Sequence, residues 1–334
     1  MNILLTSVGR RAYMVKYFKK ALEENGKIFV SNSDDRSIAF KYADESIISP
    51  LIYSDEYIAF LLEFCRKKSI DIVISLFDID LLMLARHKEQ FEEIDTKVIV
   101  SDPKIVEICN DKWKTYIFLK DNGFHTPISF LHIEDVMKAI SSGKLSYPIV
   151  VKPRYGCGSI SVAIAYDEED IRYLTKKVNE DINKTYLKYE SALSKDKVIY
   201  QAYLEGQEYG ADIINDLNGE IQNIIIRKKL AMRSGETDIA EIVDEPVIKN
   251  ELNKLGKITK HIANMDCDIF LINDIPYILE MNARFGGGYP FSHMSGCNLP
   301  KAIIEWSEGK PVDKSTLTSR IGGIWFKEIT IVEM

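Results

Sequence analysis

Short apolar runs alternate with helix-patterned segments over the first third of the chain. Such alternation predicts a doubly wound parallel sheet over residues 1–105. Ligands bind such sheets at the carboxyl ends of the strands, where we expect residues 7–9, 32–35 and 77–80 to lie. The apolar runs lie at residues 3–6, 28–31, 46–48, 72–75 and 98–100, with helical stretches expected between them, among them one that ends near 25–26 and one over 55–68.

The pattern changes after residue 102, where Asp102 and Pro103 are typical of a helix start. A second helix is expected over 112–122, and residues 130–200 then read as a helix, a strand, a loop, a helix and a strand. This order predicts a small α+β unit. We therefore expect an α/β part followed by α+β lobes.

A lysine and a glycine-rich loop stand together in this small unit. Lys152 ends an apolar strand, and Gly156, Gly158 and Ser159 lie in the loop 154–161 that follows. Glycines let backbone N–H groups close on a phosphate, and serines add hydroxyl donors. The Walker pattern is absent, which disfavours a P-loop fold. Taken alone, the loop fits an ordinary connection equally well.

The last third contains strands expected over 198–204, 221–226 and 323–331, and helices over 250–265 and 299–307. A basic cluster, Arg227, Lys228, Lys229 and Arg233, follows the strand at 221–226 and is expected to emerge toward a loop. A solvated face is the simpler interpretation of such a cluster. Its position directly before an acidic hairpin favours anion binding instead.

Two apolar runs within 268–288 flank a turn signal and predict a β-hairpin. Strand alternation puts Glu280 and Asn282 on one side, and a turn with an odd number of residues would place Asp268 opposite Glu280. Oxygen ligands of this kind suit Mg²⁺, and Arg284 lies where it could grip a phosphate oxygen. The alternative is an edge strand whose polar residues are solvated.

Composition narrows the class of protein. The 334 residues are 46% hydrophobic, enough for two or three modest domains, and five cysteines lack any Cys-x-x-Cys pair, which argues against a zinc site or a disulfide framework. The 43 basic and 50 acidic residues are interspersed, giving a net charge of −7, so nucleic-acid binding is not expected. Without a signal peptide or a membrane-length apolar run, we expect a cytoplasmic protein with no membrane partner.

In their order and spacing, these motifs resemble the ATP-grasp superfamily, and the chain looks most like single-unit relatives of the carbamoyl-phosphate synthase large chain. The motifs are a lysine on a linker helix, the strand-lysine-glycine loop, Gln-x-x-Leu-x-x-x-Glu, and Asp with Glu-x-Asn-x-Arg twelve residues on. The resemblance implies three parts: a Rossmann-like domain at 1–105, linker helices and a small lobe at 106–200, and a large lobe at 201–334.

The resemblance also assigns site residues. Lys112 and Lys152 would contact ATP phosphates beneath a flap formed by residues 156–161, including Gly156, Gly158 and Ser159. The backbone of Ala202 and Leu204 would read adenine beside Gln201, which departs from the acidic hinge residue of many members, and Glu208 would bind the ribose. Asp268, Glu280 and Asn282 would hold Mg²⁺, or alternatively Mn²⁺. Charge on the transferred phosphoryl group would be stabilised by Arg284 and by one or more of Arg227, Lys228 and Arg233.

The implied activity is an ATP-dependent carboxylate–amine ligase that forms an acylphosphate and ADP, acting on small molecules such as amino acids. A bicarbonate or carbamate kinase of the carbamoyl-phosphate type is an alternative, and a non-catalytic nucleotide-binding regulatory module is another. The second substrate would lie among residues 78–80, 233–236 and 286–293. His293 would assist there or be structural, Cys157 and Cys297 would have no catalytic role, and relatives suggest a homodimer.

Overall fold

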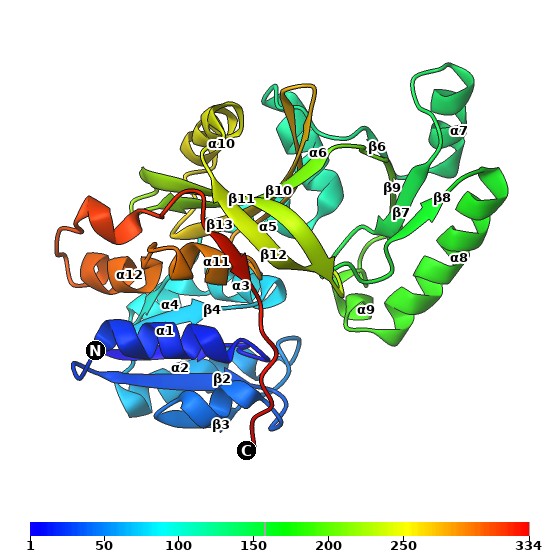
Figure 1. Cartoon of the computed structure of the whole chain (residues 1–334). Helices are drawn as coiled ribbons and strands as arrows, with labels where there is room; N and C mark the ends of the chain where they lie inside the picture. The colour runs from blue at the N-terminus through cyan, green and yellow to red at the C-terminus, as the bar shows by residue number, and fades with distance from the viewer. Residues whose placement is uncertain (157, 334) are drawn as a thin grey trace.

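A computed structural model describes residues 1–156 and 158–333 and contains three sheets (Figure 1). The first is a five-stranded parallel sheet of order β3-β2-β1-β4-β5, as predicted. Its strands are β1 (Asn2–Thr6), β2 (Lys27–Asn32), β3 (Glu45–Ile48), β4 (Ile72–Ser75) and β5 (Lys97–Val98). The helices beside it are α1 (Ala12–Leu22), the 3-10 helix η1 (Ile38–Tyr42), α2 (Tyr57–Lys68), α3 (Asp78–Arg86) and α4 (Lys88–Glu92).

Alternation along the central strand divides the helices between the two faces of this sheet. Ile3 and Leu5 pack in one apolar cluster with α1, whereas Leu4 packs in another with α2 and α4. Helix α1 ends at Leu22, before the predicted end at 25–26, because Glu23 takes a positive φ of 54° that does not continue a helix. The sheet is therefore covered on both sides, as parallel sheets require.

Two linker helices, α5 (Pro103–Asn110) and α6 (Lys112–Asp121), lead out of this part. The Asp102 carboxylate accepts a hydrogen bond from the Lys104 amide (2.8 Å), which confirms the predicted N-cap. Asp111 caps α6 in the same way and also binds the Arg154 guanidinium at 2.7 Å. That ion pair ties the start of α6 to the glycine-rich loop.

The small lobe has a four-stranded antiparallel sheet of order β6-β9-β7-β8 and confirms the α+β unit predicted over 130–200. Helices α7 and α8 pack their apolar residues on β7 and β9, and this cluster contains no residue from outside the lobe. The elements are β6 (Ser129–Phe130), α7 (Ile133–Ser141), β7 (Ile149–Pro153), β8 (Ala163–Ala165), α8 (Glu168–Lys184), α9 (Leu187–Glu190) and β9 (Val198–Ala202).

The large lobe contains a six-stranded antiparallel sheet of order β14-β13-β10-β11-β12-β15. Its strands are β10 (Gln207–Asn215), β11 (Ile221–Arg233), β12 (Glu236–Val243), β13 (Asn264–Ile272), β14 (Ile275–Asn282) and β15 (Ile324–Phe326). The remaining elements are α10 (Pro246–Thr259), α11 (Tyr289–Met294), α12 (Leu299–Ser307) and η2 (Lys314–Leu317). Together the three sheets confirm the predicted fold class.

Three expectations for this lobe are wrong in their bounds. The basic cluster does not emerge into a loop, because β11 continues to Arg233. The helix expected over 250–265 is α10, which ends at Thr259, since Lys260 is left-handed (φ 45°) and β13 begins at Asn264. The strand expected over 323–331 is only β15, after which the chain runs past the first sheet as an extended tail (Figure 1).

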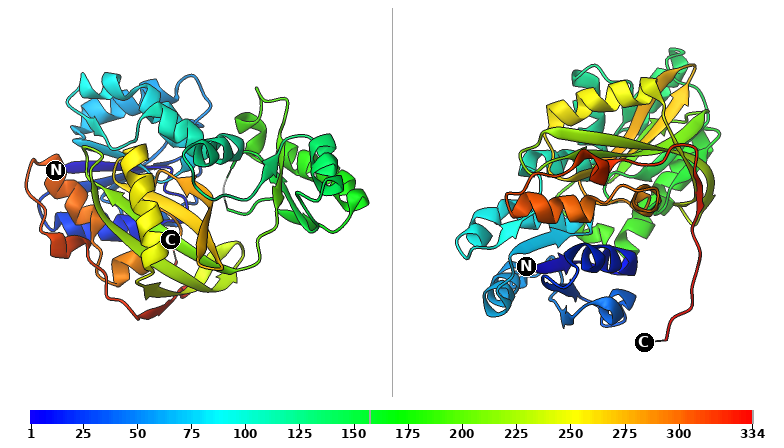
Figure 2. Two further views of the ribbon diagram at one scale, coloured as in Figure 1. Left: turned by 90° about the horizontal axis from the view of Figure 1, so that it is seen from above. Right: turned by 60° about the vertical axis from the view of Figure 1, so that its left-hand side comes forward.

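One apolar cluster joins the first sheet to the large lobe. Ile225 of β11 belongs to it, together with residues of α1 and α12, whereas Ile224 and Ile226 face α10 on the other side. Figure 2 shows these two parts packed against each other, with the small lobe projecting to one side. Among the described residues, no helix has the length and apolar character needed to cross a bilayer.

A buried histidine makes the stability of this lobe depend on pH. His261 is 0% exposed, its Nε2 lies 2.9 Å from the Ile213 carbonyl oxygen, and burial lowers its pKa from 6.5 to about 4. Between pH 6.5 and pH 4, His261 is therefore protonated in the unfolded chain and neutral in the folded chain. We expect the free energy of unfolding to fall by up to about 3 kcal/mol as pH drops from 6.5 to 4.

Urea unfolding at pH 7 and pH 5 measures this loss. His261→Gln removes the titration and should flatten the dependence, whereas His132→Gln, whose side chain is 56% exposed, should keep it. An equally steep dependence in His261→Gln would assign the effect to other groups.

Candidate active site

The hairpin of β13 and β14 brings the predicted acidic residues together. Asp268 is paired with Glu280, as predicted, and Asp266 is paired with Asn282. The predicted reason is wrong, however, because the turn has two residues, Asn273 and Asp274, both at positive φ. The extra residue comes from a β-bulge beside Asp268, which shifts the pairing by one and returns Glu280 to the face of Asp268.

Asp268 already has a cationic partner that sequence reasoning missed. Lys229 donates from Nζ to Asp268 Oδ1 and to Glu208 Oε1, at 2.6 Å each. Burial favours the neutral amine, but the two carboxylates outweigh it and raise the pKa of Lys229. The two residues expected on Mg²⁺ and on ribose are therefore joined by one ammonium group.

Strand alternation also corrects two of the predicted cations. Arg227 and Lys229 share the face of β11 that points to the hairpin carboxylates, so Lys228 lies on the other face, opposite Tyr209, which packs in the apolar cluster beneath α10. Arg233 is turned away as well, since it pairs with Asp238 and donates to the Lys327 carbonyl oxygen. Neither Lys228 nor Arg233 lines the cavities described below.

Arg227 and Arg284 are buried and bound to aspartates. Arg227 pairs with Asp212 and, at 3.1 Å, with Asp266. Burial would lower the pKa of Arg227, but these two carboxylates outweigh burial and raise it. Arg284 pairs with Asp78 at 3.0 Å and with Asp266 at 3.2 Å. Asp266 was also missed, although it stands two residues before Asp268 and so on the same side of the strand.

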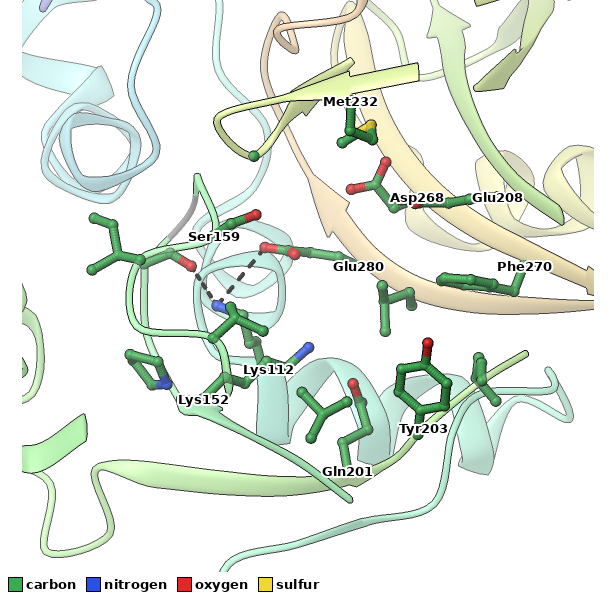
Figure 3. Close-up of a pocket in the computed structure, with 18 of the residues that line it drawn as sticks. Lys112, Lys152, Ser159, Gln201, Tyr203, Glu208, Met232, Asp268, Phe270 and Glu280 are labelled. Atoms are coloured by element: carbon green, nitrogen blue, oxygen red, sulfur yellow. Dashed lines mark hydrogen bonds and ion pairs between the residues drawn. The ribbon is translucent and has the colours of Figure 1, made fainter. Parts of the chain in front are cut away.

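A cavity of about 210 Å³ lies between the two lobes (Figure 3). Lys112 and Lys152 enter it from the small-lobe side and Glu280 from the large lobe. Lys112 Nζ donates to the Gly156 carbonyl oxygen and lies 3.8 Å from Glu280 Oε1. Lys152 is 5% exposed, and burial lowers its pKa to about 8.

All but one of the remaining predicted nucleotide residues line the same cavity, and the exception, Gly158, lines the second cavity described below. Those in the first cavity are Gly156, Ser159, Gln201, Ala202, Leu204 and Glu208, and the apolar wall includes Val150, Ile160, Met232, Phe270 and Leu279. Gln201 Nε2 donates to Ser129 Oγ at 3.0 Å, and the Ala202 amide already donates to the Ile128 carbonyl oxygen at 2.9 Å. The Ala202 amide is thus occupied by the small lobe itself.

The glycine-rich loop has a backbone that needs its glycines. Gly156 (φ 88°) and Gly158 (φ 73°) are left-handed, and a Cβ on Gly156 would clash with the Leu187 side chain. A Cβ on Gly235 would come within 2.8 Å of Ser159 Cβ, so the loop touches the turn between β11 and β12. Cys157 lies outside the described residues.

A second, more polar cavity of about 200 Å³ adjoins the first. The two share Ser159, Lys229, Met232, Gly235, Asp268 and Glu280 as lining residues, and the second is completed by Gly158 and by Arg11, Arg227, Glu236, Thr237, Asp266, Asn282, Arg284, Gly287 and Gly288. The ranges 78–80, 233–236 and 286–293 were expected here. Parts of the last two line the cavity, whereas no residue of 78–80 does. Arg11, contributed by the first sheet's α1 turn, was not anticipated.

Three further residues named in the sequence analysis make structural contacts. His293 stacks on Tyr17 with ring centroids 3.6 Å apart, and burial lowers its pKa to about 4. Asp80 is 0% exposed and accepts hydrogen bonds from Ser75 (2.9 Å) and Tyr57 (2.8 Å). Cys297 is buried among apolar residues, as predicted.

The metal donors form a small set. Among the residues in 1–156 and 158–333, no group of three or more His, Cys, Asp or Glu side chains is arranged to hold a metal ion. Glu280 and Asn282 remain as hard oxygen donors at the second cavity. Asp268 Oδ1 already accepts a hydrogen bond from Lys229. One carboxylate with one amide suits Mg²⁺, which keeps waters and phosphate oxygens in its remaining positions.

Comparisons with known proteins agree with this geometry. Residues 109–288 match a family model described as an ATP-grasp domain, and residues 3–99 match one described as a PylC-like N-terminal domain. A D-alanine–D-alanine ligase of Bacillus anthracis is 24% identical over 66% of this chain and 74% of its own. A carbamoyl-phosphate synthase of Methanobrevibacter smithii is 26% identical over 93% of this chain and 81% of its own.

Among solved structures, the biotin carboxylase domain of Hydrogenobacter thermophilus 2-oxoglutarate carboxylase, in complex with MgADP, ADP and bicarbonate, shares the fold. Its TM-score is 0.73 at 17% identity, covering 96% of this chain and 73% of that one.

Proposed function

The chain belongs to the family defined by the ATP-grasp domain, and we propose that it is an ADP-forming ligase that activates a small-molecule carboxylate with ATP and joins it to an amine. One observation carries the proposal: a lysine-bearing cavity with apolar walls adjoins a second, ionic cavity, and Glu280 lines both of them. A nucleotide in the first would present its terminal phosphate to a carboxylate in the second.

In this proposal the nucleotide lies in the first cavity, between the two lobes. Lys112 and Lys152 neutralise phosphate charge, and the glycine-rich loop closes over the phosphates with its backbone amides. Adenine lies against the apolar wall beside Gln201 and Leu204. Lys229 holds Glu208 in place for the ribose hydroxyls.

The chain would hold Mg²⁺ through Glu280 and Asn282, with Mn²⁺ as a substitute of similar preference for oxygen ligands. The bound ion would supply positive charge that offsets the phosphate oxygens. Asp268 would lie near the ion, but its carboxylate is paired with Lys229, so we assign the metal to Glu280 and Asn282 first.

In the proposed reaction the protein mainly positions the substrates and stabilises negative charge. Phosphoryl transfer to a carboxylate, followed by attack of an amine on the acylphosphate, needs no nucleophilic side chain. Arg284 faces the second cavity with its guanidinium fixed by two aspartates, a preorganised cation for charge on the transferred group. The loop excludes water that would hydrolyse the acylphosphate.

The activity is tested by incubating the protein with Mg²⁺-ATP and pools of carboxylates and amines, with and without bicarbonate, while ADP and phosphate are measured. ADP release that requires a carboxylate and an amine supports the ligase. Release with bicarbonate alone would favour the carbamoyl-phosphate-type kinase, and ATP binding without release would favour a regulatory module.

The division of the chain follows the same proposal. Residues 1–105 would form the first domain, 106–200 the linker helices and the small lobe, and 201–334 the large lobe. A homodimer is a further part of the proposal, and sedimentation of the purified protein tests it.

Lys152 gives a direct test of nucleotide binding. Lys152→Met keeps most of the length of the side chain but removes an ammonium group that is buried beside the expected phosphates. Because charge-assisted hydrogen bonds contribute about 1.5–3 kcal/mol, we expect the Kd for ATP to rise roughly tenfold to a hundredfold. Isothermal titration calorimetry measures the Kd for ATP of both proteins.

Lys195→Met is the matched control, since Lys195 is an exposed lysine of the same lobe. Equal ATP affinity in Lys152→Met and Lys195→Met would remove Lys152 from the site.

A further inference from the structure

Among the described residues, one cation of the second cavity, Arg11, has no carboxylate partner. Arg227, Lys229 and Arg284 each pair with two acidic side chains. Arg11 instead donates from Nη1 to the Phe285 carbonyl oxygen at 2.7 Å, and within the described parts of the chain no carboxylate lies within ion-pair distance of it. Its charge is therefore available to an anionic group of a ligand.

A carboxylate of the same cavity, that of Glu236, is bound by an ammonium group. Glu236 begins β12 and lines the cavity, and it accepts a hydrogen bond from Lys327 Nζ at 2.9 Å. Lys327 belongs to the tail that follows β15, and its amide donates to the Asp238 carbonyl oxygen at 2.9 Å. The ammonium group of Lys327 thus occupies Glu236 in this structure.

Arg11 and Glu236 both line the second cavity. Desolvation would raise the pKa of Glu236, but the hydrogen bond and charge of Lys327, together with the charges of Arg11 and Arg10, outweigh it and lower the pKa. Arg11 is thus near enough to act on Glu236, yet no ion pair joins them. The cavity presents separated positive and negative groups to whatever fills it.

The contact between Lys327 and Glu236 is replaceable. The Glu236 side chain is 64% exposed, and ion pairs at such positions contribute little to stability. A tethered ammonium nevertheless competes with a free one, because its effective concentration is set by the short tail that carries it. The tail is held further along by a hydrogen bond from Lys41 to the Glu333 carbonyl oxygen.

We infer that this cavity binds a zwitterionic amino acid, with its carboxylate on Arg11 and its ammonium on Glu236, in the place that Lys327 occupies in this structure. The inference rests on the proposed function, since it names the substrate class of the ligase. Glu236 and Arg11 are then specificity-determining residues, and Lys327 is a built-in competitor of the substrate.

The test is competitive binding. The full chain, with Mg²⁺ and a non-hydrolysable ATP analogue, is dialysed against an equimolar mixture of the common amino acids, the amines made by removing their carboxylates and the acids made by removing their ammonium groups. Mass spectrometry then measures what the protein retains. We expect one or more intact amino acids to be enriched over both of their partial analogues.

Three variants assign the effect to the residues. Glu236→Gln and Arg11→Gln should weaken retention of the amino acid roughly tenfold or more, because each removes a charge-assisted contact. Lys327→Met should strengthen retention several-fold. Lys310→Met breaks a similar exposed pair with Glu308 (2.8 Å) and lies outside the lining of the cavity, so it should change nothing.

Retention of the deaminated acids as strongly as the amino acids would overturn the inference, and so would absence of enrichment in both the wild type and Lys327→Met. These outcomes differ from failure of the proposed function. If simple carboxylates stimulate ADP release, the ligase proposal stands and the amino acid subsite falls. If ATP is bound but no carboxylate stimulates release, the ligase proposal itself falls.

Discussion

Glu280→Gln is expected to reduce ATP turnover by about a hundredfold or more while leaving the fold intact. Glu280 is the only acidic side chain of the hairpin that faces the nucleotide cavity without a lysine or arginine within 3.5 Å among the described residues. The substitution removes its charge but not its volume. Loss of one preorganised electrostatic contact in an active site costs about 10²–10³ in rate. ADP release measures the loss, and thermal unfolding should stay near that of the wild type.

Asp274→Asn provides the matched control, because it removes a carboxylate from the exposed turn of the same hairpin and asparagine tolerates positive φ. Its turnover should equal that of the wild type. Glu280→Ala is expected to behave as Glu280→Gln, since the apolar flank of β14 is kept. ADP formation near the normal rate in either Glu280 variant would remove the metal assignment.

Asp212→Ala is expected to lower the free energy of unfolding by about 3–5 kcal/mol, the loss typical when one partner of a buried ion pair is removed. Asp212 is 0% exposed and binds the buried Arg227, Asn264 (3.0 Å) and Ser292 (2.6 Å). Without it, Arg227 keeps Asp266 as its one ionic partner among the residues that the structure describes. Urea unfolding at neutral pH measures the difference.

Asp244→Ala serves as the comparison, since Asp244 pairs with Lys249 at 3.4 Å on the surface and both side chains are about half exposed. That pair should contribute at most about 1 kcal/mol. If Asp212→Ala unfolds as the wild type does, the Arg227 cluster does not stabilise the lobe. Arg227→Met should destabilise as well, because it leaves two aspartates buried without their shared cation.

Local patterns predicted most of the architecture and the position of the hairpin. The alternation of short strands and helices in the first third gave the correct parallel sheet, and the caps at Asp102 and the order of elements over 130–200 were also correct. Strand ends and helix ends were less well predicted. The end of α10 depends on a left-handed Lys260, which has no strong signature in the sequence.

The site was predictable where a single strand determines it and not where several strands meet. Glu280 and Asn282 share a side by alternation alone, but the facing of Asp268 depends on a bulge that no turn signal reveals. Lys229 rather than Lys228 faces the carboxylates because β11 extends through the basic cluster, which we expected to be a loop. The tail residue Lys327 lies about ninety positions from Glu236, so only the folded chain brings them together.

Among the described residues, the apolar core of the small lobe contains only residues of that lobe, whereas the first sheet and the large lobe share one apolar core. The small lobe contacts the part that contains the first sheet through a few side chains, Tyr53 with Tyr189 and Glu190, and Phe77 with Tyr186. A swing of this lobe would thus uncover little apolar surface. We expect a nucleotide to enter and leave by such a movement, whereas Arg11 and Glu236 lie on the two parts that share one apolar core.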